Sequence, residues 1–129
     1  FTLIMRRFMM RLAEQVAIKQ DCQCLITGES LAQVASQTIQ AINTTNAVCD
    51  MPVLRPVIGM DKEEIVSIAR RIETMDISIL PYEDCCTVFT PKHPQTKPTM
   101  EKVLEEERKL DVEALIAEAL EGIEKVTLG

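Results

Sequence analysis

Several motifs of common enzymes and membrane proteins are missing from this sequence of 129 residues. It has a single histidine, and it contains no Cys-x-x-Cys pair, no Ser-His-Asp arrangement and no glycine-rich phosphate loop. No apolar run is long enough to cross a bilayer, and Arg6, Arg7 and Arg11 interrupt the first apolar segment. We therefore expect neither a membrane span nor a signal peptide.

The charge balance and the cysteines narrow the class of protein further. The net charge of -6 argues against nucleic-acid binding through a broad basic surface, because phosphate contacts need clustered Lys and Arg. Five cysteines without framework-like spacing favour a reducing, cytoplasmic location over a secreted disulfide scaffold. Since 47% of the residues are hydrophobic, the chain suits one globular domain or part of one.

Apolar residues at helical spacing predict an amphipathic helix that runs from the start of the chain to about Lys19. Its apolar stripe consists of Met5, Phe8, Met9, Leu12, Ala13 and Val16. The three arginines lie off this stripe. For Arg6, a solvated position and a contact with phosphate or a base are the two alternatives.

Two short apolar strands are expected, over 22–27 and 51–58. Pro52 and Pro56 favour an edge or shortened position for the second strand, since proline cannot donate a hydrogen bond to a sheet. The alternation of helices and strands predicts an α/β fold with a parallel sheet. Two or three strands are few for a free-standing sheet, so we expect the sheet to continue in an N-terminal portion or across a dimer.

Capping residues predict where further helices start. These residues are Ser30, which forms a Ser-x-x-Gln box with Gln33, then Asp61, Thr99 and Asp111. The last of these helices has a stripe that we expect to face the core. The stripe consists of Val112, Leu115, Ile116, Ala119 and Ile123.

The junction Thr27–Ser30, between the first strand and the next predicted helix, is a candidate ligand site. In open α/β sheets, ligands bind beyond the carboxyl ends of the strands, where N–H groups of the next helix are unpaired. From residue 30 to residue 49 there is no charge, although Gln33, Gln37 and Gln40 recur at helical spacing. Such a face can lie against a ligand because little charge has to be desolvated. A solvated glutamine-rich face is the alternative.

A loop containing Pro and Lys is predicted over 81–98, and it carries the adjacent thiols Cys85 and Cys86. A loop gives a thiolate the access that a nucleophile needs. Idle thiols and a metal site that includes His93 are the alternatives, although no fourth ligand is suitably spaced. The other cysteines are interpreted as small core residues. They are Cys22, Cys24 and Cys49.

Three stretches carry a resemblance that runs in register over most of the chain. They are LITGESLAQVASQT at 25–38, LRPVI at 54–58 with DKE at 61–63, and YEDCCTVF at 82–89. They resemble the catalytic domain of the tRNA 4-thiouridine sulfurtransferases, also called the thiamine-biosynthesis ThiI proteins. The double cysteine is similar to that of bacterial members without a C-terminal rhodanese domain.

The resemblance implies a partial adenine-nucleotide α-hydrolase-like fold of the PP-loop ATP pyrophosphatase type, a parallel sheet flanked by helices. Residues 1–129 then correspond to the C-terminal portion of the catalytic domain, with the cysteine loop at 81–98 and C-terminal helices at 99–129. The family's Ser-Gly-Gly-x-Asp-Ser pyrophosphate loop and its THUMP region are absent from this sequence, and we expect them N-terminal to it.

In this family, ATP adenylates a tRNA uridine, and persulfide sulfur then displaces AMP to give 4-thiouridine. The resemblance implies the same reaction for the parent protein, with the isolated fragment inactive, and a further sulfur-transfer role in thiamine thiazole synthesis. Two other functions remain open. One is a non-catalytic nucleotide-binding or dimerisation module, and the other is a PP-loop ligase with another acceptor.

The resemblance also implies site residues and partners. The nucleotide contacts fall on Arg6, Gly28 and Gln37, and the sulfur-carrying cysteine falls on Cys85, with Cys86 as the alternative. ATP is the expected cofactor, with Mg²⁺ in the full-length protein, and no metal ligand is assigned in this chain. The expected partners are tRNA, bound mainly through the N-terminal region, a cysteine desulfurase or other persulfide donor, and a second copy in a homodimer.

Overall fold

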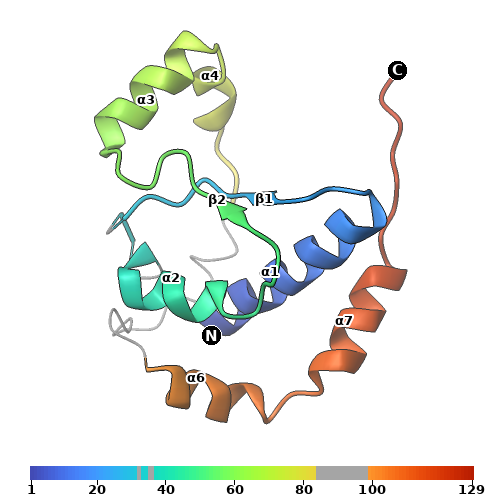
Figure 1. The fold of residues 1–129 in the computed structure, drawn as a ribbon. Coiled ribbons are helices and arrows are strands. Elements are labelled where there is room, and N and C mark those ends of the chain that lie inside the picture. The colour runs from blue at the N-terminus through green and yellow to red at the C-terminus, as the bar shows by residue number, and fades with distance from the viewer. Residues whose placement is uncertain (32, 35–36, 84–98) are drawn as a thin grey trace.

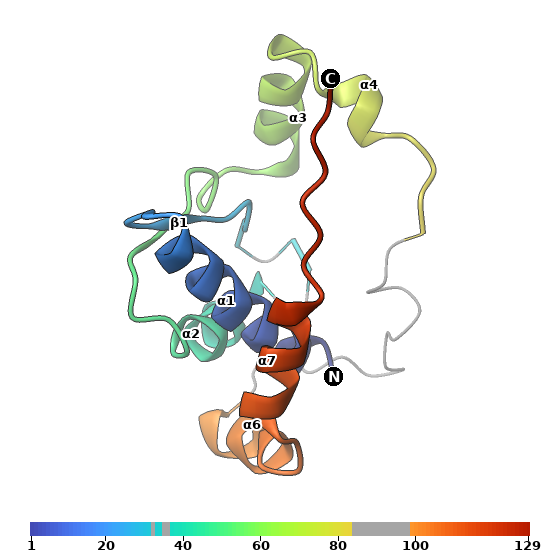
Figure 2. The ribbon, with the colours of Figure 1, turned by 90° about the vertical axis from the view of Figure 1, so that its right-hand side faces the viewer.

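The computed structural model describes residues 1–31, 33–34, 37–83 and 99–129. Two strands lie in the middle of the molecule, with α1 and α2 on one side and α3 and α4 on the other (Figures 1 and 2). In chain order the elements are α1 (Thr2–Lys19), β1 (Leu25–Ile26), α2 (Ile39–Asn46), β2 (Val53–Leu54), α3 (Lys62–Arg71), α4 (Met75–Ser78), α6 (Met100–Glu107) and α7 (Val112–Glu121).

The strands β1 and β2 pair in parallel, as predicted, with Ile26 opposite Leu54. Both are shorter than the predicted strands, because Pro52 and Pro56 flank β2 and cannot donate to a ladder. Ile26 is 69% exposed and Leu54 is 51% exposed. In the described part of the chain, the side chains of both residues are therefore exposed to solvent.

Helix α1 has the predicted length, but it buries a different face. Its buried residues are Arg7, Met10, Glu14 and Ala17. Three residues of the predicted apolar stripe are exposed, namely Met9, Ala13 and Val16. The predicted face was wrong because charged residues can be buried when they are paired. Arg7 pairs with Glu107, and Glu14 Oε1 accepts hydrogen bonds from the backbone N–H groups of Asp50 and Met51 at 2.8 and 2.7 Å.

The predicted helix starts at Asp61, Thr99 and Asp111 are confirmed. Asp61 forms a reciprocal capping box with Glu64, in which each backbone N–H donates to the other residue's carboxylate at 2.8 Å. Thr99 accepts a hydrogen bond from Lys102 N, and Asp111 accepts one from Ala114 N.

The predicted helix start at Ser30 is wrong. Residues 31, 33 and 34 form turns or bends. The next α-helix in the described part of the chain is α2, which begins after Thr38, whose hydroxyl accepts a hydrogen bond from Ala41 N. Ser30 Oγ instead donates to Met60 O at 2.6 Å. The hydroxyl therefore joins the segment after β1 to the segment after β2, and this long-range contact replaces the local cap.

Helices α6 and α7 both pack against α1, and α7 lies in front of α1 in Figure 2. On the stripe predicted for the last helix, Val112 and Ile116 are half-buried, while Leu115 and Ile123 are 41% and 56% exposed. The stripe is therefore only partly correct. Among the described helices, none is long and apolar enough to span a membrane.

The three cysteines outside the predicted loop are free thiols. Cys22 is exposed, so its assignment to the core was wrong, whereas Cys24 and Cys49 are half-buried. Cys22 lies beyond the end of α1, where its backbone N–H donates to Ala17 O. Burial, followed by the nearby charge of Glu14, raises the pKa of the Cys49 thiol.

Candidate functional site

The candidate site lies at the carboxyl end of β1, where the chain turns away from the sheet. Thr27 N donates to Leu54 O, and Leu31 N donates to Ile58 O, both at 3.0 Å. The turn over residues 27–31 is therefore tied at both ends to the segment that leaves β2. Such a turn is held in place by backbone hydrogen bonds, which suits a ligand site that must keep its shape.

A buried carboxylate lies at the centre of this turn. Glu29 is 4% exposed and accepts hydrogen bonds from three residues on three parts of the chain. Arg6 Nη2, from the first turns of α1, lies 2.5 Å from Oε1. Arg55 Nε, directly after β2, and Thr27 Oγ1 both lie 2.7 Å from Oε2. Each carboxylate oxygen of Glu29 therefore binds one arginine.

The surroundings of Glu29 favour its charged form. Burial acts to raise the pKa of Glu29, but the hydrogen bonds from Thr27 and Arg55 and the charge of Arg6 outweigh burial, so the pKa lies below its usual range. Glu29 is thus a carboxylate at neutral pH. Two guanidinium groups around one carboxylate leave one positive charge in excess in this cluster.

The three residues predicted to contact a nucleotide come together around this turn. Arg6 reaches the turn through Glu29, and Gln37 reaches it through Ser30, whose backbone N–H donates to Gln37 Oε1 at 2.8 Å. Gly28 is exposed, and a Cβ at this position would meet nothing within 4 Å. The arrangement leaves the backbone of Gly28 open to a ligand, while the binding roles of the three residues stay predictions.

Glu29 and Arg55 are central to this geometry, yet neither was predicted as a site residue. A signal for Glu29 is present in the sequence, because it is the one charged residue between Asp21 and Asp50. If an isolated acid after a strand and a glycine is buried, it needs a cation or other donors from elsewhere in the chain. The sequence does not say that Arg6 and Arg55 supply it.

A second buried ion cluster joins α1 to α6. Arg7 Nε and Nη2 donate to the Glu107 carboxylate at 3.1 and 3.0 Å, and Arg11 Nη1 and Nη2 donate to it at 2.6 and 3.0 Å. Arg7 Nη1 also donates to Thr44 O in α2. The hydrogen bonds from Arg11, with those from Arg7 and both charges, outweigh burial and lower the pKa of Glu107 to about 2. This cluster connects three helices and has a structural role.

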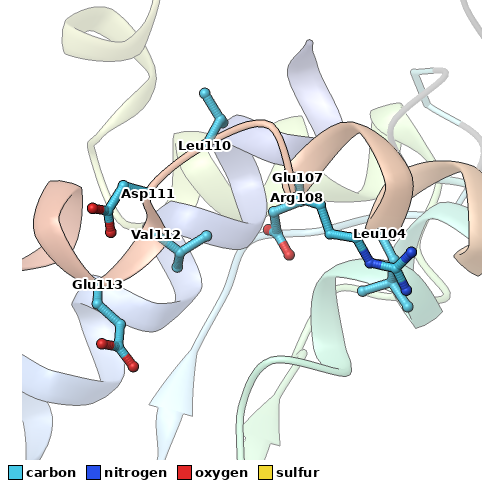
Figure 3. A pocket seen from close by; sticks show the side chains of 7 residues that line it. All are labelled: Leu104, Glu107, Arg108, Leu110, Asp111, Val112 and Glu113. Carbon is cyan, nitrogen blue, oxygen red and sulfur yellow. The ribbon is translucent and has the colours of Figure 1, made fainter.

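A pocket of about 260 Å³ lies between α6 and α7 (Figure 3). It is lined by Leu104, Glu107, Arg108, Leu110, Asp111, Val112 and Glu113. Its Glu107 carboxylate is already bound by two arginines. The pocket is therefore a weaker candidate for a ligand site than the turn after β1.

In the part of the chain that the structure describes, no group of three or more His, Cys, Asp and Glu could hold a metal ion.

Cys85, Cys86 and His93 lie outside the described residues. The predicted sulfur-carrying role of the two thiols therefore stays a prediction, as does the alternative that they take no part in catalysis.

The sequence is similar to known proteins over most of its length. A family profile described as "Thiamine biosynthesis protein (ThiI)" matches residues 1–112. A probable tRNA sulfurtransferase of Alkaliphilus oremlandii is 58% identical over 123 residues, which are 95% of this chain and 31% of the relative. A probable tRNA sulfurtransferase of Acetivibrio thermocellus is 57% identical over 127 residues, 98% of this chain and 32% of the relative. The chain thus spans about a third of the length of these relatives.

One solved structure is similar in both fold and sequence. It is the crystal structure of a 4-thiouridine synthetase in complex with RNA and with bound ATP. It matches with a TM-score of 0.85 and 38% identity over 94% of this chain and 32% of that chain. This likeness confirms the predicted fold class, an α/β arrangement of the PP-loop type with a parallel sheet and flanking helices.

Proposed function

The chain belongs to the ThiI family of thiamine-biosynthesis proteins, and from this premise we propose that it is part of an ATP-dependent tRNA sulfurtransferase. The proposed enzyme adenylates a tRNA uridine with ATP, and persulfide sulfur then displaces AMP to leave 4-thiouridine. The observation that carries the proposal is the gathering of Arg6, Gly28 and Gln37 around one turn at the carboxyl end of β1. In an α/β sheet this is the place where a nucleotide binds.

The residues of the turn fit a nucleotide in charge and in shape. The cluster around Glu29 has one positive charge in excess, which suits a phosphate. The open space at Gly28 lets a ligand approach the backbone. Since Gln37 Oε1 is taken by Ser30, the amide NH₂ of Gln37 is the group that we propose donates to the nucleotide. ATP is the nucleotide proposed, with Mg²⁺ in the full-length protein.

The sulfur-handling step is proposed for Cys85, with Cys86 as the alternative. The Cys85 thiolate attacks the terminal sulfur of a persulfide from a cysteine desulfurase or another donor, whose own thiolate leaves. The resulting Cys85 persulfide attacks the adenylated uridine carbon as AMP leaves. A thiol reductant then attacks Cys85 Sγ, which breaks the S–S bond, releases 4-thiouridine and leaves a disulfide between Cys85 and the reductant. Regions outside this chain bind most of the tRNA, which agrees with the net charge of -6. A homodimer, a cytoplasmic location and a role in thiamine thiazole synthesis belong to the same proposal.

The test is thiolation of unmodified tRNA by the full-length protein with ATP, Mg²⁺, cysteine, a purified cysteine desulfurase and a thiol reductant. We expect ATP-dependent 4-thiouridine, measured by mass spectrometry of the tRNA nucleosides, and a fall to background in Cys85→Ser or in Cys86→Ser. Cys22→Ser is the matched control because Cys22 is an exposed thiol outside the proposed site. This control should keep the wild-type rate.

Other outcomes would support the competing functions. Release of AMP without thiolated tRNA would favour a PP-loop ligase with another acceptor. ATP binding without AMP release would favour a non-catalytic nucleotide-binding or dimerisation module. Normal thiolation in both single cysteine variants would remove the sulfur-carrying role from the predicted loop.

A further inference from the structure

We infer that Arg55 is a positioning residue for nucleotide binding, because it neutralises Glu29 and thereby leaves the positive charge of Arg6 available to a nucleotide phosphate. The inference rests on the proposed function only in taking an adenine nucleotide as the ligand. It adds a residue that contacts no ligand itself and acts through two others.

The first step of the argument is the charge balance within the cluster. With Glu29 alone, Arg6 would form a neutral pair that has little attraction for an anion. Arg55 Nε binds the other carboxylate oxygen of Glu29 at 2.7 Å and supplies the charge that balances it. The charge of Arg6 then stays in excess, in a chain whose net charge is -6. The side chains of Arg6 and Arg55 are only 23% and 16% exposed, so solvent screens these charges incompletely.

The second step is the difference between the two arginines in their hydrogen bonds. Every nitrogen of the Arg55 guanidinium binds the protein: Nε binds Glu29, Nη2 binds Asn46 Oδ1 at 3.1 Å, and Nη1 binds Val53 O at 3.4 Å. Arg6 donates only through Nη2 to a described residue. Arg55 is therefore held in place by the protein, while Arg6 keeps donors for a ligand.

The third step concerns the donors that Arg6 leaves unused. Arg6 Nε is buried and has no hydrogen-bond partner in the described part of the chain. A buried donor without an acceptor is unfavourable, and more so when it carries a charge. An incoming anion that binds the Arg6 guanidinium lowers this cost by compensating its charge. Phosphate fits best, because its oxygens match the planar guanidinium group.

The inference predicts that Arg55 affects the charged part of the nucleotide and not the nucleoside. Isothermal titration of the full-length protein compares the dissociation constants for ATP and adenosine. In Arg55→Met we expect ATP to bind about tenfold more weakly or worse, while adenosine stays within about twofold. In Arg55→Lys the ammonium group can still neutralise Glu29, so ATP affinity should return to within about threefold of wild type.

Two further variants serve as controls. Arg71→Met makes the same charge change on an exposed position of α3 and should leave ATP affinity unchanged. The double variant Arg55→Met/Glu29→Gln removes one charge of each sign, so it should bind ATP more tightly than Arg55→Met alone. The double variant also removes the buried charge of Glu29 that Arg55 balances, so it provides the comparison if Arg55→Met does not fold.

Equal weakening of ATP and adenosine in Arg55→Met would overturn the inference, since it would show a merely structural role. Unchanged ATP affinity in Arg55→Met would overturn the inference as well. So would a double variant that binds ATP no more tightly than Arg55→Met. If Arg55→Met does not fold, a double variant that binds ATP far more weakly than wild type would overturn the inference. These results are separate from a failure of the proposed function. A wild-type protein that binds ATP but makes no 4-thiouridine overturns the proposed function and leaves this inference standing.

Discussion

Glu29 shows how one buried carboxylate can organise a site. Its burial is unfavourable alone, and the donors from Arg6, Arg55 and Thr27 compensate for it. Each donor comes from a different part of the chain, so the carboxylate aligns α1, the turn after β1 and the segment after β2. The neighbouring Gly28 has no such packing role, because its surroundings are open. Experiments can therefore distinguish a role in folding at Glu29 from a role in binding at the neighbouring Gly28.

Gly28→Ala is expected to separate binding from stability. A Cβ at Gly28 meets nothing within 4 Å and no glycine has a positive φ, so the substitution should leave stability unchanged or raise it by about 0.4–1 kcal/mol. A methyl group between the backbone and a bound nucleotide should weaken ATP binding by about fivefold or more in the full-length protein. Chemical denaturation and isothermal titration measure the two quantities.

The control is Gly59→Ala, since Gly59 also has open surroundings and a φ that is not positive. It should leave ATP affinity unchanged. Equal ATP affinity in Gly28→Ala and wild type would show that no nucleotide approaches this backbone.

At the scale of elements, α1 connects the candidate site to the rest of the fold. Consecutive residues on this helix point in directions about 100° apart, so Arg6 and Arg7 serve different partners. Arg6 reaches the turn after β1, while Arg7 reaches α2 and α6. The contact with α6 holds α1 through Glu107. A change in this contact should therefore affect the stability of the fold before it affects the site.

Glu107→Ala is expected to destabilise the protein by about 3–5 kcal/mol at neutral pH, because it leaves the buried Arg7 without its charge partner. Urea denaturation measures this change in the free energy of unfolding. Glu106→Ala is the matched control on the same helix, since its ion pair with Lys109 is exposed on both sides. The control should change stability by less than about 1 kcal/mol. Equal effects of the two variants would contradict the structural role of the Glu107 cluster.

The same cluster predicts how stability depends on pH. The pKa of Glu107 is lowered in the folded state to about 2 from an ordinary value of 4.5. A lowered folded-state pKa gives stability that is fully present above the unfolded-state pKa and is lost as the pH falls through the folded-state value. Denaturation between pH 5 and pH 2, in the range set by these two values, should show wild type losing more stability than Glu107→Ala. Parallel pH profiles would contradict this.

At the scale of the whole molecule, we expect the candidate site and the two-stranded sheet to be parts of larger ones. The sequence contains no glycine-rich phosphate loop, and the Ile26 and Leu54 side chains on the paired strands are exposed. The chain covers about a third of the length of its relatives. These observations agree with our proposal, in which the turn after β1 supplies one wall of a nucleotide site.

Under the proposed function, we expect the 129-residue chain alone to make no 4-thiouridine from ATP, a persulfide donor and tRNA, and the full-length protein to make it. The reason is that the pyrophosphate of ATP would have no loop to bind it. Mass spectrometry of the tRNA nucleosides measures the product. Circular dichroism of the isolated chain must show the helices of the native fold for the comparison to count. Thiolation by the folded 129-residue chain would contradict this view of the site.

Local signals predicted much of the fold. Asp61, Thr99 and Asp111 cap helices as expected, because a cap is a hydrogen bond to a residue three positions ahead. Ser30 matched the same type of pattern and failed, since its hydroxyl binds Met60, 30 residues away. The face of α1 failed for a similar reason. Its buried arginine has a partner that no local pattern can identify.

The sequence by itself determined the family, the α/β class, the extent of α1 and several helix starts, because motifs and caps depend on neighbouring residues. Only the tertiary structure decided what the arginines do. Glu29 lies 23 positions from Arg6 and 26 from Arg55, and Glu107 lies 100 positions from Arg7. The hydrophobic periodicity of the sequence predicts that all of these charged residues lie on the surface. The fold brings each acid to its arginines, and the pairing compensates for the cost of burying their charges.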